Sequence, residues 1–88
     1  MAKLTFTEHG WEEYVFWQTH DLKTLKKINK LLKEVQRTPF KGGGKPEPLK
    51  NTNPNTWSRR INQKDRLVYE VSDDGIIIKQ CKGHYDDK

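Results

Sequence analysis

The chain has 88 residues, which suits one small domain with a modest hydrophobic core, and we expect that domain to span residues 1–88. Lysine and arginine number 17 against 12 aspartate and glutamate, so the formal net charge of +5 predicts a partner rich in negative charge, either nucleic acid or an acidic protein. A single cysteine, Cys81, excludes an intrachain disulfide, and the three scattered histidines lack metal-ligand spacing. No apolar run is long enough to span a bilayer and no signal peptide is visible, so we expect a cytoplasmic protein without a cofactor or membrane contact.

The first quarter of the chain predicts a short strand followed by a helix. Residues 3–7 alternate polar and apolar side chains, which is typical of a strand, and Thr7 can then cap the helix. Gly10 costs this helix about 1 kcal/mol relative to alanine. Aromatic and apolar residues recur at helical spacing, and we interpret them as a packing stripe, with a base-stacking platform as the alternative. These residues are Trp11, Tyr14, Val15, Phe16 and Trp17.

A second helix is predicted to begin after Asp21, a good N-cap, and to end at Thr38 before a proline. The two helices should form an antiparallel hairpin. The apolar face of the second helix is predicted to comprise Leu22, Leu25, Ile28, Leu31, Leu32 and Val35. Its other positions carry lysines, which form either a solvated face or an electrostatic footprint on nucleic acid. The lysines are Lys23, Lys26, Lys27, Lys30 and Lys33.

Residues 38–50 form a stretch rich in glycine and proline that presents one acid. The glycines at 42–44 allow a sharp turn. Pro46 and Pro48 fix their own φ and favour extended geometry in the residue before each. Glu47 lies between these prolines and is therefore stiffly presented.

Three strands are expected over residues 57–61, 66–71 and 76–82, joined by short polar turns into an antiparallel meander. The predicted fold class is α+β, with the N-terminal strand and helical hairpin packed on one face of a curved, mainly antiparallel sheet of four to five strands. A three-residue loop between the last two strands would place His84 on the face of Arg66. A two-residue loop at Asp74 and Gly75 would place them on opposite faces, although a bulge could still bring them together.

A carboxylate, an arginine and a histidine beside a basic surface can together cleave RNA without a metal. The 2′-hydroxyl of RNA is the nucleophile, so one group must remove its proton, another must protonate the leaving 5′ oxygen, and a cation should stabilise the phosphorane. Glu47, His84 and Arg66 match these tasks in that order, and Tyr85 could stack on an unpaired base. A noncatalytic basic binding module remains the alternative, because each residue could equally be a surface charge.

Six segments, in order over residues 3–85, resemble the YoeB toxins of the RelE/ParE toxin–antitoxin superfamily. They are Trp11 to Tyr14 with Trp17 and Gln18, Arg37 to Phe40, Gly44 to Lys50, Trp57 to Ile61, Arg66 to Tyr69, and His84 with Tyr85. The resemblance implies a microbial-ribonuclease-like fold, two helices on a curved antiparallel sheet.

The resemblance also implies a function: a bacterial toxin that cleaves messenger RNA on the translating ribosome. Residues that match the family's general base, phosphate ligand and general acid are Glu47, Arg66 and His84. We expect contacts to RNA from Lys45, Lys50, Arg59, Arg60 and Tyr85. The implied partners are ribosome-bound mRNA, ribosomal RNA, an acidic YefM-like antitoxin and, in a homodimer, a second copy of the chain.

Overall fold

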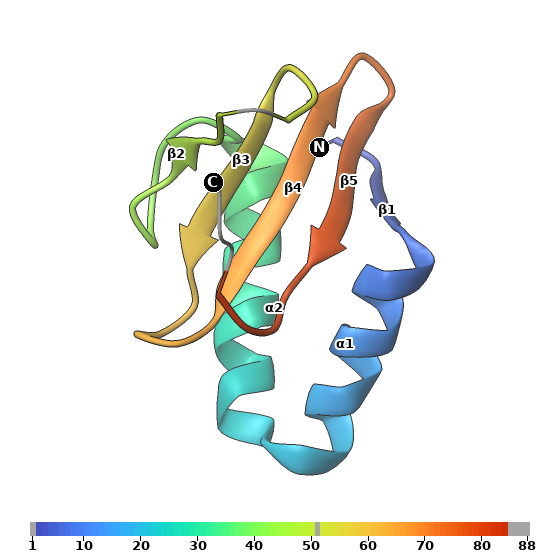
Figure 1. The fold of residues 1–88 in the computed structure, drawn as a ribbon, viewed down its shortest axis with the longest axis vertical. Helices are drawn as coiled ribbons and strands as arrows, with labels where there is room; N and C mark the ends of the chain where they lie inside the picture. Colours follow the sequence, from blue (N-terminus) through green and yellow to red (C-terminus); the bar gives the residue numbers. More distant parts are fainter. Residues whose placement is uncertain (1, 51, 85–88) are drawn as a thin grey trace.

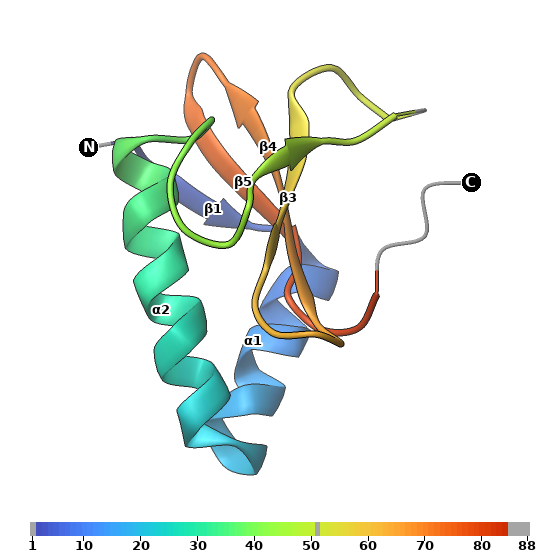
Figure 2. The same ribbon diagram turned by 90° about the vertical axis from the view of Figure 1, so that its left-hand side faces the viewer.

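Two helices cover one face of a five-stranded sheet, and the opposite face carries no helix (Figures 1 and 2). The computed structural model describes residues 2–50 and 52–84. The helices are α1 (Glu8–His20) and α2 (Leu22–Arg37). The strands are β1 (Leu4–Phe6), β2 (Glu47–Pro48), β3 (Thr56–Arg60), β4 (Arg66–Ser72) and β5 (Gly75–Gln80).

The sheet has the strand order β1-β5-β4-β3-β2, with β1 parallel to β5 and the other pairs antiparallel. The predicted α+β class and the helical hairpin are therefore confirmed. Strand β2 was not predicted, because its two residues, one of them a proline, carry no alternating pattern. None of the helices in the described part of the chain is long and apolar enough to cross a membrane.

Both predicted helix caps are confirmed. The Thr7 hydroxyl accepts a hydrogen bond from the Gly10 backbone N–H at 3.0 Å. Asp21 accepts bonds from the Thr24 backbone at 3.2 Å and from the Thr24 hydroxyl at 2.7 Å. The hydroxyl bond is the main reason that the pKa of the Asp21 carboxyl lies below its usual value. Polar side chains thus satisfy helix N–H groups that have no partner within the helix.

Helix α1 buries only part of the predicted stripe, with Trp17 in the core and Tyr14 and Phe16 packed against it. Gly10 and Trp17 are its buried residues, whereas Trp11 and Val15 are 51% and 39% exposed. A Cβ at Gly10 would lie 2.5 Å from the carbonyl oxygen of Ile78, so the glycine allows α1 to approach β5 closely. The packing interpretation holds for Trp17 and, at the edge of the core, for Trp11, whose ring contacts those of Phe6 and Tyr14. It is wrong for Val15, because the helix turns Gly10 towards the sheet.

Helix α2 packs against the sheet largely as predicted. Ile28, Leu31, Leu32 and Val35 are buried, but Leu22 is 62% exposed because it lies in the first turn, beyond the sheet. The five lysines of α2 are exposed. Since α2 lies behind the sheet, they do not line its open face (Figure 2).

Both predicted registers for the β4–β5 hairpin are wrong at the turn. Ser72 pairs with Gly75, so the loop consists of Asp73 and Asp74. A bulge between Val68 and Tyr69 then shifts the pairing by one residue, and Val68 pairs with Gln80. Bulges of this kind re-aim the side chains beyond them. Beyond the bulge, towards Arg66, the pairing therefore has the register that was predicted for the three-residue loop.

Candidate active site

Glu47 and Arg66 lie on the same open face of the sheet. Residues directly opposite each other on neighbouring strands point to the same face. Glu47 pairs with Ser58, which pairs with Val68, and Arg66 pairs with Arg60 two residues farther along β3. Two strand spacings and a two-residue offset place the Cα atoms of Glu47 and Arg66 about 12 Å apart. That span leaves room for one nucleotide linkage between the two side chains.

The backbone on both sides of Glu47 is anchored to β3. The Arg60 N–H donates to the Gly44 carbonyl at 2.6 Å, and the Leu49 N–H donates to the Thr56 carbonyl at 2.8 Å. Gly44 has a φ of +80°, and a Cβ there would lie 2.9 Å from the Arg60 carbonyl oxygen. The side chain of Glu47 is exposed on this anchored segment. The stiffness predicted from the prolines is thus reinforced by pairing to the sheet.

Arg59, predicted to bind RNA, is completely buried, so that prediction is wrong. Residues alternate in facing along a strand, and Arg59 points towards the helices. Its guanidinium donates to the Tyr69 hydroxyl and to three loop carbonyls, with nothing left at the surface. The bonds are Nε to Tyr69 Oη at 3.1 Å, Nη1 to Gly43 O at 3.2 Å, and Nη2 to Thr38 O at 2.6 Å and Lys41 O at 3.0 Å.

Two further residues complete this buried network. The Glu34 carboxylate accepts from the Gly43 N–H at 2.8 Å and lies 3.8 Å from the Arg59 guanidinium. The Tyr69 hydroxyl donates to the Pro39 carbonyl at 2.6 Å. Burial raises the pKa of Tyr69, and the adjacent guanidinium opposes that shift. The network fixes the loop that leads to Glu47.

The guanidinium of Arg66 is half-buried and bonded on one side. Its Nη1 donates to the carbonyls of Asn62 at 2.7 Å and Asp65 at 3.1 Å. Among residues 2–50 and 52–84, nothing accepts a hydrogen bond from its Nη2 or Nε. The planar fork therefore keeps donors available for the paired oxygens of a phosphate.

His84 is exposed and directly follows a residue bonded to Arg66. The backbone N–H of Arg66 donates to the Gly83 carbonyl at 3.0 Å, and Gly83 has a φ of +83°. Arg66 and His84 are thus neighbours through the backbone, as expected near a frayed strand end. Tyr85, predicted to stack on a base, lies outside the described residues.

Asp65 is a buried residue beside the site that sequence reasoning did not select. It is 4% exposed, and its Oδ1 accepts from the Gly83 N–H at 2.7 Å while its Oδ2 accepts from Asn62 Nδ2 at 3.1 Å. In sequence it is one polar residue in a polar turn. Only the long-range bond to Gly83 distinguishes it, and no local pattern predicts that bond.

Comparison with known proteins shows which family the chain belongs to. The model of the YoeB-like toxins of bacterial type II toxin–antitoxin systems matches residues 6–85. The chain belongs to this family. It is 51% identical to Toxin YoeB of Escherichia coli over 83 residues, which covers 94% of this chain and 99% of the relative. Toxin YoeB of Streptomyces coelicolor is 52% identical over the same shares of this chain and the relative.

Solved structures of YoeB toxins have the same fold. A YoeB/ParE toxin from Agrobacterium tumefaciens superimposes with a TM-score of 0.89 at 47% identity, covering 94% of this chain and 99% of the other. The YoeB dimer from Staphylococcus aureus gives a TM-score of 0.88 at 46% identity, covering 96% and 98%. The E. coli DinJ–YafQ complex, at 16% identity and a TM-score of 0.72, shares the fold alone.

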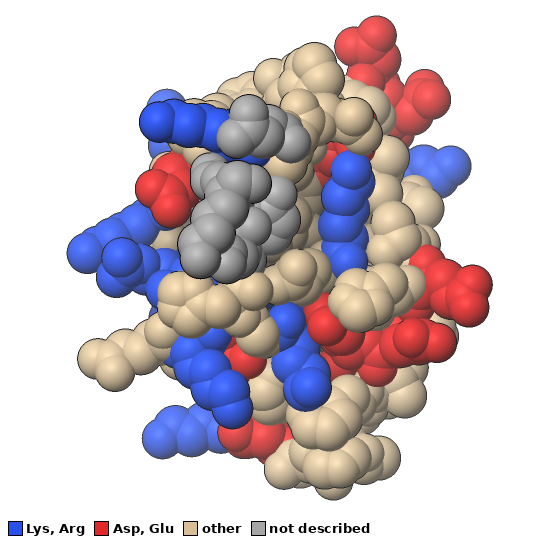
Figure 3. Space-filling model, viewed as in Figure 1, with Lys and Arg blue, Asp and Glu red and all other residues tan. Residues whose placement is uncertain are grey.

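Charge on the open face of this YoeB-like toxin is unevenly distributed (Figure 3). Lysine and arginine side chains gather on the left and lower parts of the view, over β2, β3 and the β3–β4 loop, whereas acidic side chains lie mainly at the right edge and over the β4–β5 turn. A basic surface of this kind attracts a polyanion and orients its approach. Basic residues of those segments are Lys45, Lys50, Arg60, Lys64 and Arg66.

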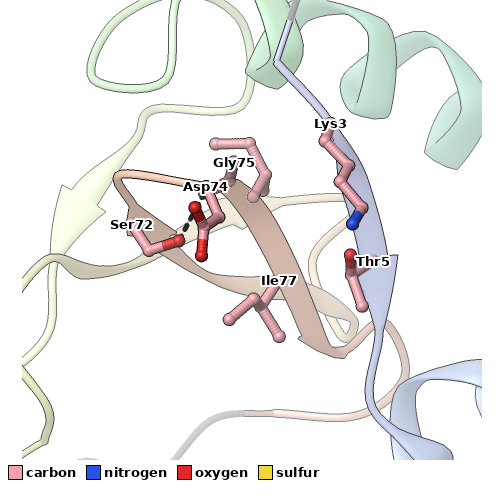
Figure 4. Close-up of a pocket in the computed structure, with 7 residues that line it drawn as sticks. Lys3, Thr5, Ser72, Asp74, Gly75 and Ile77 are labelled. Atoms are coloured by element: carbon pink, nitrogen blue, oxygen red, sulfur yellow. Dashed lines mark hydrogen bonds between the residues drawn. The ribbon is translucent and has the colours of Figure 1, made fainter.

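A hollow of this YoeB-like toxin lies at the other end of the sheet from Arg66 (Figure 4). It has a volume of about 220 Å³ and lies beside the β4–β5 turn, where the Ser72 hydroxyl donates to the Gly75 carbonyl at 3.2 Å. Its lining contains neither histidine nor arginine, so it lacks two of the residue types that Glu47, Arg66 and His84 bring to the candidate site. The lining residues are Lys3, Thr5, Ser72, Asp74, Gly75, Ile76 and Ile77.

Proposed function

We propose that this YoeB-like toxin is a cytoplasmic endoribonuclease that cuts translated mRNA on the ribosome and thereby inhibits translation. The observation that supports it best is the placement of Glu47 and Arg66 on one open face, with the residue before His84 bonded to the Arg66 backbone. These residues come from three separate segments of the chain. A base, a phosphate ligand and an acid on one basic surface suffice for RNA cleavage.

In the proposed reaction the Glu47 carboxylate removes the proton from the 2′-hydroxyl, and the 2′ oxygen attacks the adjacent phosphorus. The bond from phosphorus to the 5′ oxygen breaks, and His84 in its imidazolium form protonates that oxygen. The products are a 2′,3′-cyclic phosphate and a 5′-hydroxyl. Arg66 stabilises the added charge of the phosphorane through its remaining guanidinium donors.

Binding of the RNA strand is assigned to basic residues around these three. Lys45 and Arg60 are exposed on the segments next to Glu47 and Arg66, and Lys50 follows β2. Cations in these positions contact phosphates and orient the strand without reading its sequence. Stacking of a base on Tyr85 remains a prediction.

An acidic antitoxin of the YefM type is the partner that would neutralise this activity. Support comes from the YoeB–YefM complex of Staphylococcus aureus, whose toxin superimposes on this chain with a TM-score of 0.85 at 44% identity. We propose that the antitoxin covers part of the Glu47, Arg66 and His84 surface or displaces the segment around His84. The Staphylococcus aureus dimer similarly supports a homodimer of this chain.

The test is cleavage mapping on translating ribosomes. Glu47→Ala, Arg66→Ala and His84→Ala should each slow cleavage on the order of a hundred-fold or more. Lys33→Ala on the rear helix is the matched control and should cleave like the wild type. Unchanged cleavage by all three site variants would refute the proposal. A wild type that binds the ribosome without cleaving, and whose binding is weakened by lysine variants of α2 more than by Glu47→Ala, would indicate a noncatalytic binding module. Cleavage of naked RNA at the same rate would indicate a free ribonuclease.

A further inference from the structure

We propose that Asp65 is a positioning residue for His84, acting through the peptide of Gly83. The inference rests on the proposed function, because it assigns a role to Asp65 only if His84 is the general acid. Asp65 would not touch the RNA. Its carboxylate would set the direction in which the chain leaves the sheet towards His84.

Gly83 is held at both of its polar backbone groups. Its N–H donates to Asp65 Oδ1 at 2.7 Å, and its carbonyl accepts from the Arg66 N–H at 3.0 Å. The Gln80 side chain adds a longer bond to the same carbonyl at 3.4 Å. The φ of +83° is a conformation that residues other than glycine rarely adopt. Two adjacent residues, Asp65 and Arg66, therefore hold the two peptide groups on either side of the Gly83 Cα, immediately before the proposed acid.

The buried Asp65 carboxylate uses one of its two oxygens for the bond to Gly83. Burying a carboxylate costs free energy unless its oxygens accept hydrogen bonds. Asn62 satisfies Oδ2 from within the turn, and its own Oδ1 holds the turn by accepting from the N–H groups of Lys64 at 2.8 Å and Asp65 at 2.7 Å. Oδ1 of Asp65 bonds outside the turn, to Gly83, so it links the turn to the C-terminal segment.

The same turn also orients the Arg66 guanidinium, through the carbonyls of Asn62 and Asp65. One short segment thus sets the position of the phosphate ligand and of the proposed acid together. A displacement of about 1 Å in a catalytic group can cost on the order of a hundred-fold in rate. Asp65→Ala keeps the backbone carbonyls that hold Arg66 and removes the carboxylate that holds Gly83, so it should impair proton transfer more than phosphate binding.

The deciding experiment compares two messages on translating ribosomes, one ordinary and one with sulfur in place of the 5′ bridging oxygen at the cut. A thiolate leaves without being protonated, so the sulfur message does not need the acid. Asp65→Ala should slow cleavage of the ordinary message at least ten-fold and cleave the sulfur message at nearly the wild-type rate, as His84→Ala should. Glu47→Ala should stay slow on both messages.

A double variant is designed to restore these hydrogen bonds while it moves the negative charge from position 65 to position 62. In Asn62→Asp/Asp65→Asn, the new carboxylate at position 62 accepts from the turn and from the new amide at position 65, whose oxygen accepts from Gly83. Hydrogen exchange should show the Gly83 amide protected in the wild type and the double variant, and unprotected in Asp65→Ala. The double variant should also recover cleavage of the ordinary message.

Equal slowing of Asp65→Ala on both messages would overturn the inference while leaving the proposed function intact. An unprotected Gly83 amide in the wild type would overturn it too, without any measurement of activity. Failure of the wild type to cleave either message would refute the proposed function and this inference with it.

Discussion

Arg59 Nε donates a hydrogen bond to the Tyr69 hydroxyl across 3.1 Å, between two fully buried side chains. The Tyr69 hydroxyl in turn donates to the Pro39 carbonyl, and the remaining donors of Arg59 bond to carbonyls of the same loop. These hydrogen bonds therefore hold the loop that leads to Glu47 from the helix-covered side of the sheet. Stability of the fold and placement of the proposed base depend on one guanidinium.

Arg59→Met should lower the free energy of unfolding on the order of 3 kcal/mol, because it leaves the Tyr69 hydroxyl and several partly buried loop carbonyls without a donor while keeping most of the side-chain volume. Urea denaturation measures the change. Arg60→Met, its exposed neighbour on β3, is the control and should change stability by less than about 0.5 kcal/mol. Equal effects of the two variants would contradict the structural role of Arg59.

Gly10→Ala should destabilise the protein although alanine is the better helix former. The propensity gain is about 1 kcal/mol, but the new Cβ would lie 2.5 Å from the Ile78 carbonyl, and overpacking of this kind costs about 1–3 kcal/mol. Helix α1 would have to move away from β5. Thermal unfolding checks this, with the exposed Glu12→Ala on the same helix as the control. A raised melting temperature for Gly10→Ala would contradict the close approach.

The ion pair between Glu70 and Lys79 should contribute stability that is lost in acid. Lys79 Nζ lies 2.8 Å from Glu70 Oε1 on the open face, and this hydrogen bond holds the pKa of Glu70 below its usual value of 4.5. A carboxyl with a lowered folded pKa stabilises the fold above the unfolded pKa and loses that contribution as the pH falls. A double-mutant cycle with Glu70→Gln and Lys79→Met should give a coupling of about 0.5 kcal/mol at pH 7. The coupling should vanish near pH 2, and persistence there would argue against a charge interaction.

Cys81 should make the fold less stable in alkali. Burial, and secondarily the Glu13 and Asp65 carboxylates, raise the pKa of its thiol from 9.0 to about 12. A raised folded pKa means that the contribution is complete below pH 9 and is lost as the pH rises towards 12. Wild type should therefore lose about 1.4 kcal/mol per pH unit more than Cys81→Ala in that range. Parallel pH profiles for the two proteins would contradict this, as would rapid alkylation of folded wild type at pH 8.

Local features of this fold could be predicted from sequence, because their causes lie within a few residues. The caps at Thr7 and Asp21 depend on N–H groups three residues away, and both are present as expected. The role of Arg59 could not be read in this way. Its acceptors lie up to 21 residues away, and on a strand of a basic chain an arginine resembles a surface charge.

The candidate site likewise combines features that the sequence predicts with features that only the folded chain shows. Residue types at Glu47, Arg66 and His84 suggested the chemistry, but the placement of His84 relative to Arg66 depends on the bulge at Val68 and Tyr69. No signal in the sequence marks this bulge, so hairpin arithmetic chose the wrong residues for the turn although its three-residue register holds beyond the bulge. The bond from Gly83 to Asp65 likewise spans 18 residues and needed the folded chain to be seen.

The parallel pairing of β1 with β5 has a consequence for synthesis of the chain. Residues 4–6 find their strand partners only at residues 76–78, so the sheet cannot close until nearly the whole described sequence has been made. Pairing across such a separation forms late in folding. The bond from the Arg66 N–H to the Gly83 carbonyl likewise needs residue 83 to have been made. Given the proposed function, a polypeptide that is still being synthesised has no complete active site and therefore cannot cleave the mRNA that encodes it.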